Sequence, residues 1–198
     1  MTPRWQRGGS ILPRRERTRR SALLARWDPI TLHVAPDANG SAGGILLIED
    51  GESDAHGGGG AHTGGAHTGG AHTGGWAGAI LELKLECEGD RCVLRSTPRP
   101  SGGEGVGAAV GDAPTRAAAR AIIPEAIHVE RVLIRIPRAS VYAQGAPPEV
   151  SLRVEGALPV RVEARWSDHG VVVERMRAPC LQTWQLVARG LAQALTQL

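Results

Sequence analysis

Apolar and polar residues alternate with a period of two over much of the chain, and this pattern predicts β-strands. Leu81, Leu83 and Leu85 fall on one face of such a segment, while Glu82 and Lys84 fall on the other. Further segments of this kind, or short apolar runs, occupy residues 30–34, 45–48, 131–136, 150–155, 160–166 and 171–173. Because successive side chains of a strand point to opposite faces, each segment offers an apolar face to a core.

Turn-forming residues separate these segments. The sequence Glu-Gly-Asp-Arg at 88–91 predicts a hairpin, the Asp-His-Gly at 168–170 predicts a second turn, and residues 36–40 form a third. Helical spacing of leucines occurs only in residues 189–198. The pattern therefore predicts an all-β fold, an antiparallel β-sandwich with long Gly-rich loop insertions and a short C-terminal helix.

Two segments rich in glycine interrupt the strand pattern, at residues 57–75 and 101–120. Both are predicted to be flexible surface loops, because glycine-rich backbone loses much entropy on ordering. His62, His67 and His72 recur every five residues in the first loop. Neutral imidazoles can bind zinc, nickel or copper, but no fourth ligand or orienting group accompanies these three. We therefore predict no metal site, with a metal-responsive segment as the alternative.

Composition and charge narrow the class of protein. Phenylalanine is absent and Tyr142 is the single tyrosine, so the core must be built from Val, Leu, Ile and Trp. Residues 1–26 hold eight arginines and one glutamate, yet no aromatic residues interleave with the run at 14–20 to stack on bases. We expect no nucleic-acid partner. No apolar run is long enough for a membrane span, and the amino terminus shows no secretory-signal pattern.

Three collinear segments resemble family 31 of the glycoside hydrolases, most closely its glucosidase II group. Residues 7–13 (Arg-Gly-Gly-Ser-Ile-Leu-Pro) resemble an element that directly follows the family's catalytic barrel. Residues 28–35 and 43–52 are similar to its strand, turn, strand and acidic-acidic-Gly sequence, and residues 127–134 to a later strand. Residues 171–187 loosely resemble the closing hairpin of that group.

The resemblance implies a parent enzyme that cleaves α-glucosides of glucosylated oligosaccharides, including N-glycans, by a retaining mechanism in the lumen of the endoplasmic reticulum. Such an enzyme needs two carboxyl groups on a (β/α)₈ barrel of roughly 250 residues. This chain has 198 residues and lacks the family's Asp-Met-Asn-Glu nucleophile sequence. We therefore predict a non-catalytic C-terminal region, without catalytic, cofactor or metal residues of its own.

The resemblance also implies a division of the chain and a set of partners. Residues 1–26 are expected to be the remnant of a proximal sandwich and residues 27–198 a distal sandwich. The expected partners are the barrel of the parent enzyme and a glucosidase II β-type subunit. The remnant is expected to be disordered or to expose apolar surface around Ile11, Leu12, Leu23 and Leu24. The alternative is a stand-alone module that binds carbohydrate or protein.

The remaining candidate residues have ordinary structural interpretations. Glu49, Asp50, Glu52 and Asp54 do not have EF-hand spacing, so a turn is favoured over a calcium site. Cys87 and Cys92 flank the predicted hairpin turn and could form a disulfide in an oxidising compartment, whereas Cys180 is expected to be a buried apolar residue. Trp166 and Trp184 are predicted to lie in the core, and Trp27 and Trp76 to cap it, rather than to stack on sugars.

Overall fold

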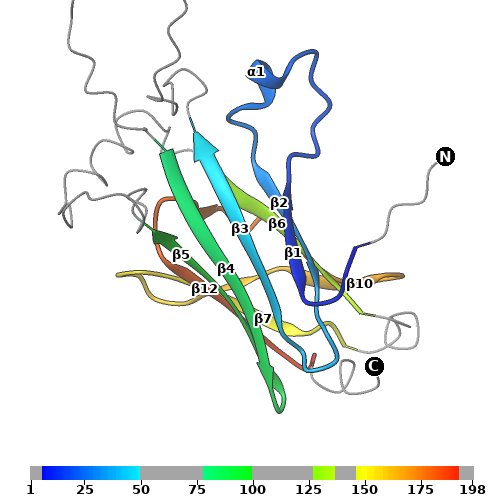
Figure 1. The fold of residues 1–198 in the computed structure, drawn as a ribbon. Helices are drawn as coiled ribbons and strands as arrows, with labels where there is room; N and C mark the ends of the chain where they lie inside the picture. The colour runs from blue at the N-terminus through cyan, green and yellow to red at the C-terminus, as the bar shows by residue number, and fades with distance from the viewer. Residues whose placement is uncertain (1–5, 50–77, 100–126, 137–145, 192–198) are drawn as a thin grey trace, which may run out of the picture.

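The computed structural model describes residues 6–49, 78–99, 127–136 and 146–191, and nearly all of the regular secondary structure in these residues is β-strand (Figure 1). The strands are β1 (Ser10–Arg14), β2 (Ile30–Ala35), β3 (Ala42–Glu49), β4 (Gly78–Glu88), β5 (Arg91–Arg99), β6 (His128–Arg135), β7 (Glu149–Val154), β8 (Val160–Val162), β9 (Ala164–Ser167), β10 (Gly170–Val173), β11 (Ala178–Pro179) and β12 (Trp184–Arg189). The helix α1 is a single turn, Ala22–Ala25. No helix in these ranges is long and apolar enough to cross a bilayer.

All of these strands belong to one sheet, in the order β8-β7-β12-β5-β4-β3-β1-β2-β6-β10-β9, with β11 beside β6. Most neighbours are antiparallel, and the exceptions are β1 with β3 and β2 with β6. The sheet curls until it is nearly barrel-shaped. The predicted all-β, mainly antiparallel fold is confirmed. The two layers expected of a sandwich are opposite walls of one continuous curled sheet.

The edge strands of this sheet follow each other directly in sequence. Residues 160–166 were expected to form one strand, but the chain leaves β8 at Val162 and enters β9 at Ala164, on the opposite edge. Glu163, the residue between them, accepts a backbone hydrogen bond from Glu174 at 3.1 Å. The corner at Glu163 therefore brings the two edges of the sheet together.

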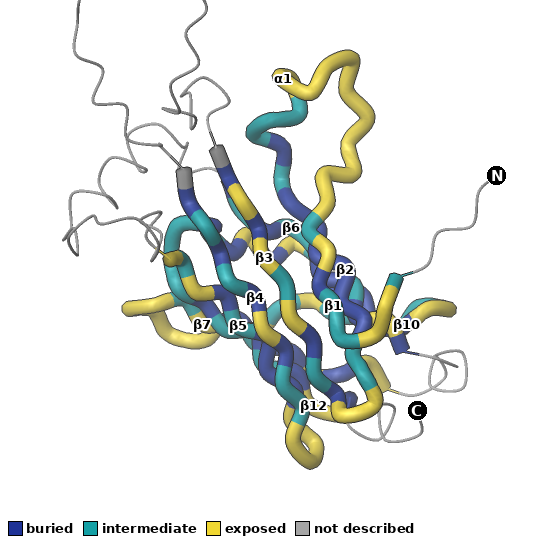
Figure 2. The backbone as a smooth tube through the Cα atoms, viewed as in Figure 1, coloured by how far each residue is buried: buried dark blue, intermediate teal, exposed yellow. Residues whose placement is uncertain are grey.

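The core lies on the inner side of the curled sheet and follows the predicted alternation. Leu81, Leu83 and Leu85 of β4 are almost fully buried, and Trp184 of β12 is the largest fully buried side chain. Figure 2 shows buried and exposed positions alternating along β3, and buried positions alternating mainly with intermediate ones along β4. Removal of this apolar surface from water is the main stabilising contribution to the fold.

The β4–β5 hairpin forms at the predicted place. Its two-residue turn is Gly89-Asp90, and Gly89 has a positive φ of 56°, which glycine adopts without strain. Cys87 and Cys92 are directly opposite each other and are joined by a disulfide. Gly40, in the β2–β3 turn, leaves room for this bridge, because a Cβ there would lie 2.9 Å from that of Cys87.

Three expectations about the ends of the described chain need correction. Residues 171–187 do not form a closing hairpin, because β10 pairs with β6 and β9 whereas β12 pairs with β5 and β7. Ile11 is not exposed: it is 2% accessible and lies in the core, since β1 is a central strand between β3 and β2. The division at residue 27 stays a prediction. The loops at 57–75 and 101–120 lie outside the described residues. The helix expected over residues 189–198 does not begin at 189, because Arg189 is the last residue of β12, and residues 192–198 lie outside the described residues.

A candidate docking face

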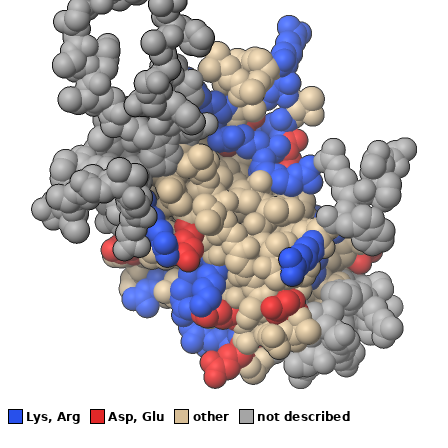
Figure 3. Space-filling view, in the orientation of Figure 1, with Lys and Arg blue, Asp and Glu red and all other residues tan. Residues whose placement is uncertain are grey.

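Three large aliphatic side chains project from the outer side of the two central strands β1 and β3. Ile45 is 69% exposed, Leu47 is 49% exposed and Leu12 is 46% exposed, whereas their neighbours Leu46 and Ile11 point into the core. In the space-filling view, uncharged atoms cover the surface over these strands (Figure 3). We call Leu12, Ile45 and Leu47 the outer apolar patch. Large aliphatic groups gathered on one surface are typical of a surface that contacts another structure.

A glycine brings the two strands of the patch together. Gly44 of β3 faces the backbone of Ile11 in β1, and a Cβ at this position would overlap the Ile11 carbonyl oxygen and lie 2.9 Å from its Cβ. The parallel pairing of Ser10 with Gly43 sets the register of the two strands. Leu12 is two residues after Ser10 and Ile45 is two residues after Gly43, so they occupy equivalent positions on adjacent parallel strands. The absence of a side chain at Gly44 therefore allows the close approach that forms the patch.

The segment between β1 and β2, which we call the arm (residues 15–29), is fixed by an ion pair whose carboxylate is buried. The guanidinium of Arg19 donates two hydrogen bonds to the Asp28 carboxylate, at 2.8 and 2.6 Å. The Asp28 side chain is only 6% exposed. The hydrogen bonds from Arg19 hold the pKa of Asp28 below its usual value, so this carboxylate is ionised at neutral pH.

Further charged contacts join the arm to the sheet. Glu16 accepts a hydrogen bond of 2.7 Å from Nε2 of His33 on β2, and its other oxygen lies 3.7 Å from Arg131 on β6. Arg17 lies 3.6 Å from Glu130, also on β6. His33 is 6% exposed although it is on the same face as Leu12, its cross-strand partner. The arm therefore covers β2 and leaves the outer apolar patch beside it uncovered.

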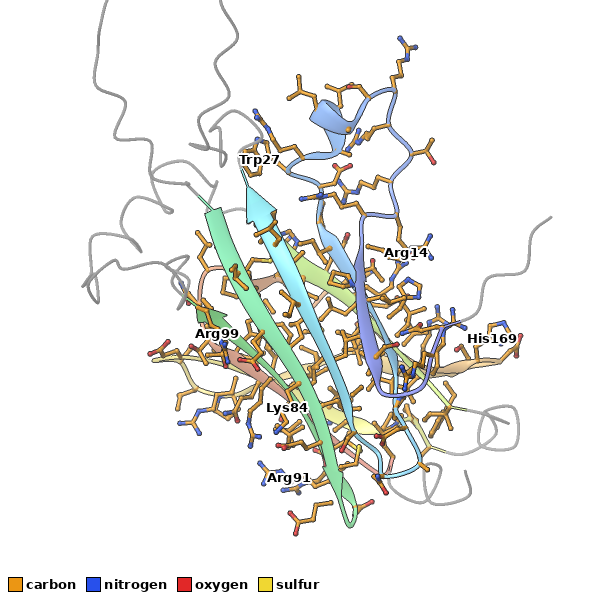
Figure 4. The ribbon with its side chains drawn as sticks, viewed as in Figure 1. Arg14, Trp27, Lys84, Arg91, Arg99 and His169 are labelled. Atoms are coloured by element: carbon orange, nitrogen blue, oxygen red, sulfur yellow. A yellow bond between two sulfur atoms is a disulfide. The ribbon has the colours of Figure 1, made fainter. Side chains whose placement is uncertain are left out.

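The arm carries apolar side chains of its own. Leu23 and Leu24, both in α1, are more than 60% exposed, as expected from the sequence. Trp27 packs partly against the core, and the Arg26 guanidinium lies 4.8 Å from the centre of its ring. Figure 4 shows Trp27 at the base of the arm. The exposed leucines could extend the contact area of the outer apolar patch to a second element.

The other predicted candidates do not assemble into a chemical site in the part of the chain that the structure describes. Glu49 ends β3, while Asp50, Glu52 and Asp54 and the histidines of the repeat, His62, His67 and His72, lie outside the described residues. Among the described residues, no three His, Cys, Asp or Glu side chains are grouped as metal ligands would be.

The cysteines and tryptophans have structural positions. The Cys180 thiol is fully buried, and desolvation raises its pKa to about 12, so it is a protonated, unreactive core residue. Trp184 is in the core as predicted. Trp166 packs partly against the core, and its indole N–H donates a 3.0 Å hydrogen bond to the carbonyl of Ala146. Trp76 lies outside the described residues.

Carboxylates on the outer faces of the strands are also bound to cations. Glu86 contacts both Lys84 at 2.6 Å and Arg95 at 2.7 Å, and the hydrogen bond from Lys84 is the largest cause that lowers the pKa of Glu86. Glu174 lies 3.2 Å from Arg165. Glu86, whose pKa is lowered in this way, is a poor proton donor at neutral pH, so it can position strands but is unsuited to general acid catalysis.

The outer apolar patch was not singled out from the sequence, although a signal for it exists. Residues 45–48 (Ile-Leu-Leu-Ile) form a continuous apolar run, whereas the neighbouring strand β4 alternates leucines with charged residues over 81–86. A continuous run is typical of a strand that is covered on both faces. In this chain only one face of that run is covered by described residues, and the other face carries Ile45 and Leu47.

Comparison with known proteins places the chain near glucosidase II. No protein-family model matches it. Over 51 residues it is 49% identical to Neutral alpha-glucosidase AB of Dictyostelium discoideum and of Homo sapiens, and 39% identical to Glucosidase 2 subunit alpha of Saccharomyces cerevisiae. These 51 residues are 26% of this chain and 5% of each relative's length.

The fold is similar over a larger part of the chain. The crystal structure of a glucosidase II alpha subunit in its alpha3-Glc2-bound form superposes on 92% of this chain with a TM-score of 0.58 at 18% identity. A heterodimeric complex of an ER glucosidase II catalytic subunit with the binding domain of its regulatory subunit gives a TM-score of 0.53. The alignments cover 16% and 17% of those chains. The resemblance to the glucosidase II group is therefore confirmed, and this chain matches a small part of such a subunit.

Proposed function

We propose that this chain forms the non-catalytic C-terminal β region of a family 31 α-glucosidase-like glycoside hydrolase and packs against its catalytic barrel. The observation that carries the proposal is the outer apolar patch on the central strands β1 and β3. Its three side chains are between 46% and 69% exposed. Complete burial of this remaining surface against a partner would contribute about 3 kcal/mol, at roughly 2 kcal/mol for each fully buried aliphatic side chain.

The charged residues support a structural role rather than catalysis. A retaining glycosidase needs one carboxyl group with a raised pKa, which donates a proton to the leaving group. Asp28 and Glu86 have lowered pKa values because cationic partners donate hydrogen bonds to them. The described residues form a curled, mainly antiparallel sheet, not the alternating strands and helices of a (β/α)₈ barrel.

The activity and setting of the parent enzyme follow from the relatives. They are named as α-glucosidases, and we propose that the parent removes glucose from N-linked glycans in the lumen of the endoplasmic reticulum. The disulfide between Cys87 and Cys92 fits an oxidising compartment. One related catalytic subunit is known in complex with the binding domain of a regulatory subunit. A β-type regulatory subunit is therefore the second partner that we propose.

The docking proposal can be tested with a glucosidase II catalytic subunit from which the segment matching this chain has been removed. The 198-residue chain is added in trans, and binding is measured by calorimetry. The Ile45→Asp/Leu47→Asp variant should lose binding, because two charges would be buried in the contact. Leu158→Asp is the matched control, since Leu158 is 85% exposed in the β7–β8 turn and lies on neither strand of the patch.

Binding of the unmodified chain and of the Leu158→Asp variant, with loss in the double variant, would support the proposal. Absence of binding, or equal binding by all three proteins, would contradict it. In the second case a stand-alone interaction module, with a different contact surface, would become the better explanation.

A further inference from the structure

A depression lined by four arginines lies on the outer side of β5, β7, β8 and β12, on strands other than those of the outer apolar patch. Its volume is about 410 Å³. The arginines are Arg91, Arg153, Arg161 and Arg189, and Glu149 is the single acidic residue among the described residues of the lining. We call this feature the arginine depression. Figure 4 shows the Arg91 side chain projecting outward near the turn that joins β4 and β5.

The strand register explains why these side chains gather. Residues 149, 151 and 153 of β7 alternate outward, and Ser151 is paired with Arg161 of β8. On the other side, β12 pairs Gln185 with Arg153 and Arg189 with Glu149. Arg189 is also directly opposite Arg91 of β5. Four adjacent strands therefore each contribute one guanidinium to the same surface.

This concentration of positive charge is offset only in part by the described carboxylates, of which Glu149 is directly opposite Arg189 and Glu88 is directly opposite Arg91. Elsewhere on the sheet arginines have carboxylate partners: Arg95 pairs with Glu86, Arg99 with Glu82 and Arg165 with Glu174. None of the four arginines of the depression makes an ion pair with a carboxylate in the described ranges. Like charges directly opposite each other on adjacent strands are destabilising, as between Arg91 and Arg189. A bound anion would remove this repulsion.

The lining also suits a small ligand that carries oxyanions. Ser151 and Gln185 are half-buried between the arginines and offer neutral hydrogen-bond donors, while Val187 and Pro159 supply apolar contact. The planar guanidinium matches a phosphate group with two parallel hydrogen bonds. The volume is in the range of small-molecule sites and exceeds what one inorganic phosphate fills.

We propose that the arginine depression binds a small ligand with at least two phosphate groups. The ligand could be a soluble diphosphate or the phosphorylated headgroup of a lipid, since both present the same chemistry to the guanidinium groups. This inference is independent of the proposed role in a glycoside hydrolase, because it rests on a different surface.

The test is calorimetric titration of the 198-residue chain with pyrophosphate. We expect saturable binding that weakens as salt is added, because the arginines that supply it are exposed. The Arg153→Gln/Arg161→Gln variant should bind about tenfold more weakly, which corresponds to the loss of about 1.4 kcal/mol. Arg99→Gln is the matched control, because Arg99 is on the same strand as Arg91 but is paired with Glu82 outside the depression.

A second variant acts in the opposite direction. Glu149→Gln removes a carboxylate from the lining and should strengthen binding of pyrophosphate, which general damage to the fold would not do. Sedimentation with phosphatidylcholine vesicles that contain phosphatidylinositol 4-phosphate distinguishes the two sources. Selective sedimentation would identify a lipid headgroup, and pyrophosphate binding without sedimentation would identify a soluble ligand. No pyrophosphate binding, or equal weakening by Arg99→Gln, would overturn the proposal.

Discussion

Substitution of Gly44 by alanine tests whether β1 lies against β3 as the structure shows. A Cβ at residue 44 would overlap the carbonyl oxygen of Ile11 and lie 2.9 Å from its Cβ. No rotamer change can relieve an overlap with backbone, so β1 must move away from β3. Overpacking of this kind costs about 1–3 kcal/mol, and we expect Gly44→Ala to be near the upper end.

The adjacent glycine provides a matched control. A Cβ at Gly43 would meet nothing closer than the Leu83 carbonyl oxygen at 3.9 Å, which is an ordinary contact. Gly43→Ala should be neutral or stabilising by about 0.5 kcal/mol, because alanine restricts the unfolded chain. The two variants should therefore differ by about 3 kcal/mol, or roughly 6–12 °C in melting temperature for a chain of this size.

Thermal unfolding followed by tryptophan fluorescence measures this difference, since Trp184 is buried in the native protein. Equal melting temperatures for Gly43→Ala and Gly44→Ala would refute the close approach of β1 and β3. They would then remove the basis for the outer apolar patch, which needs these two strands side by side.

Three further predictions concern single residues. Cys87→Ser should lower the free energy of unfolding by about 2 kcal/mol, which is the chain-entropy value for a loop this short. The wild type should lose the same amount of stability under reducing conditions. A melting temperature that does not change with reductant would contradict the disulfide. Cys180 should react with iodoacetamide at pH 8 only after unfolding, because its thiol is buried with a pKa of about 12, and rapid labelling of the native protein would contradict this. Asp28→Asn should lower the melting temperature at pH 7. Because the pKa of Asp28 is lowered in the folded state, the ionised carboxylate stabilises the fold above the unfolded pKa near 4, and this stabilisation is lost as the pH falls through the folded pKa. The melting temperatures of the wild type and the variant should therefore become equal in acid, and a difference that stays constant with pH would exclude the ion pair as the cause.

The period-two pattern predicted strands such as β4 well, because one face of that strand lies in the core. Leu81, Leu83 and Leu85 are buried as their alternation indicated, and the turn at Gly89 and Asp90 follows from residue types that favour turns. Alternation does not encode which strands are neighbours. The corner at Glu163, which joins the two edges of one sheet, therefore could not be predicted from the sequence.

Long-range contacts explain the remaining differences. Ile11 was expected to be exposed because its segment was treated as separate from the rest, but its pairing with Val34 places it in the core. The arm shows the same limit, since Arg19 and Asp28 are nine residues apart and nothing in their spacing specifies a bidentate pair. The arginine depression depends on register across four strands, which the sequence pattern alone does not determine.

Hydrolysis of an α-glucoside by the purified 198-residue chain is the most direct test of its proposed non-catalytic role. We predict no release of glucose above that of a blank without protein, because Asp28 and Glu86 have lowered pKa values and are held ionised by their cationic partners. Turnover that survives repurification and remains proportional to the amount of chain would contradict the proposal.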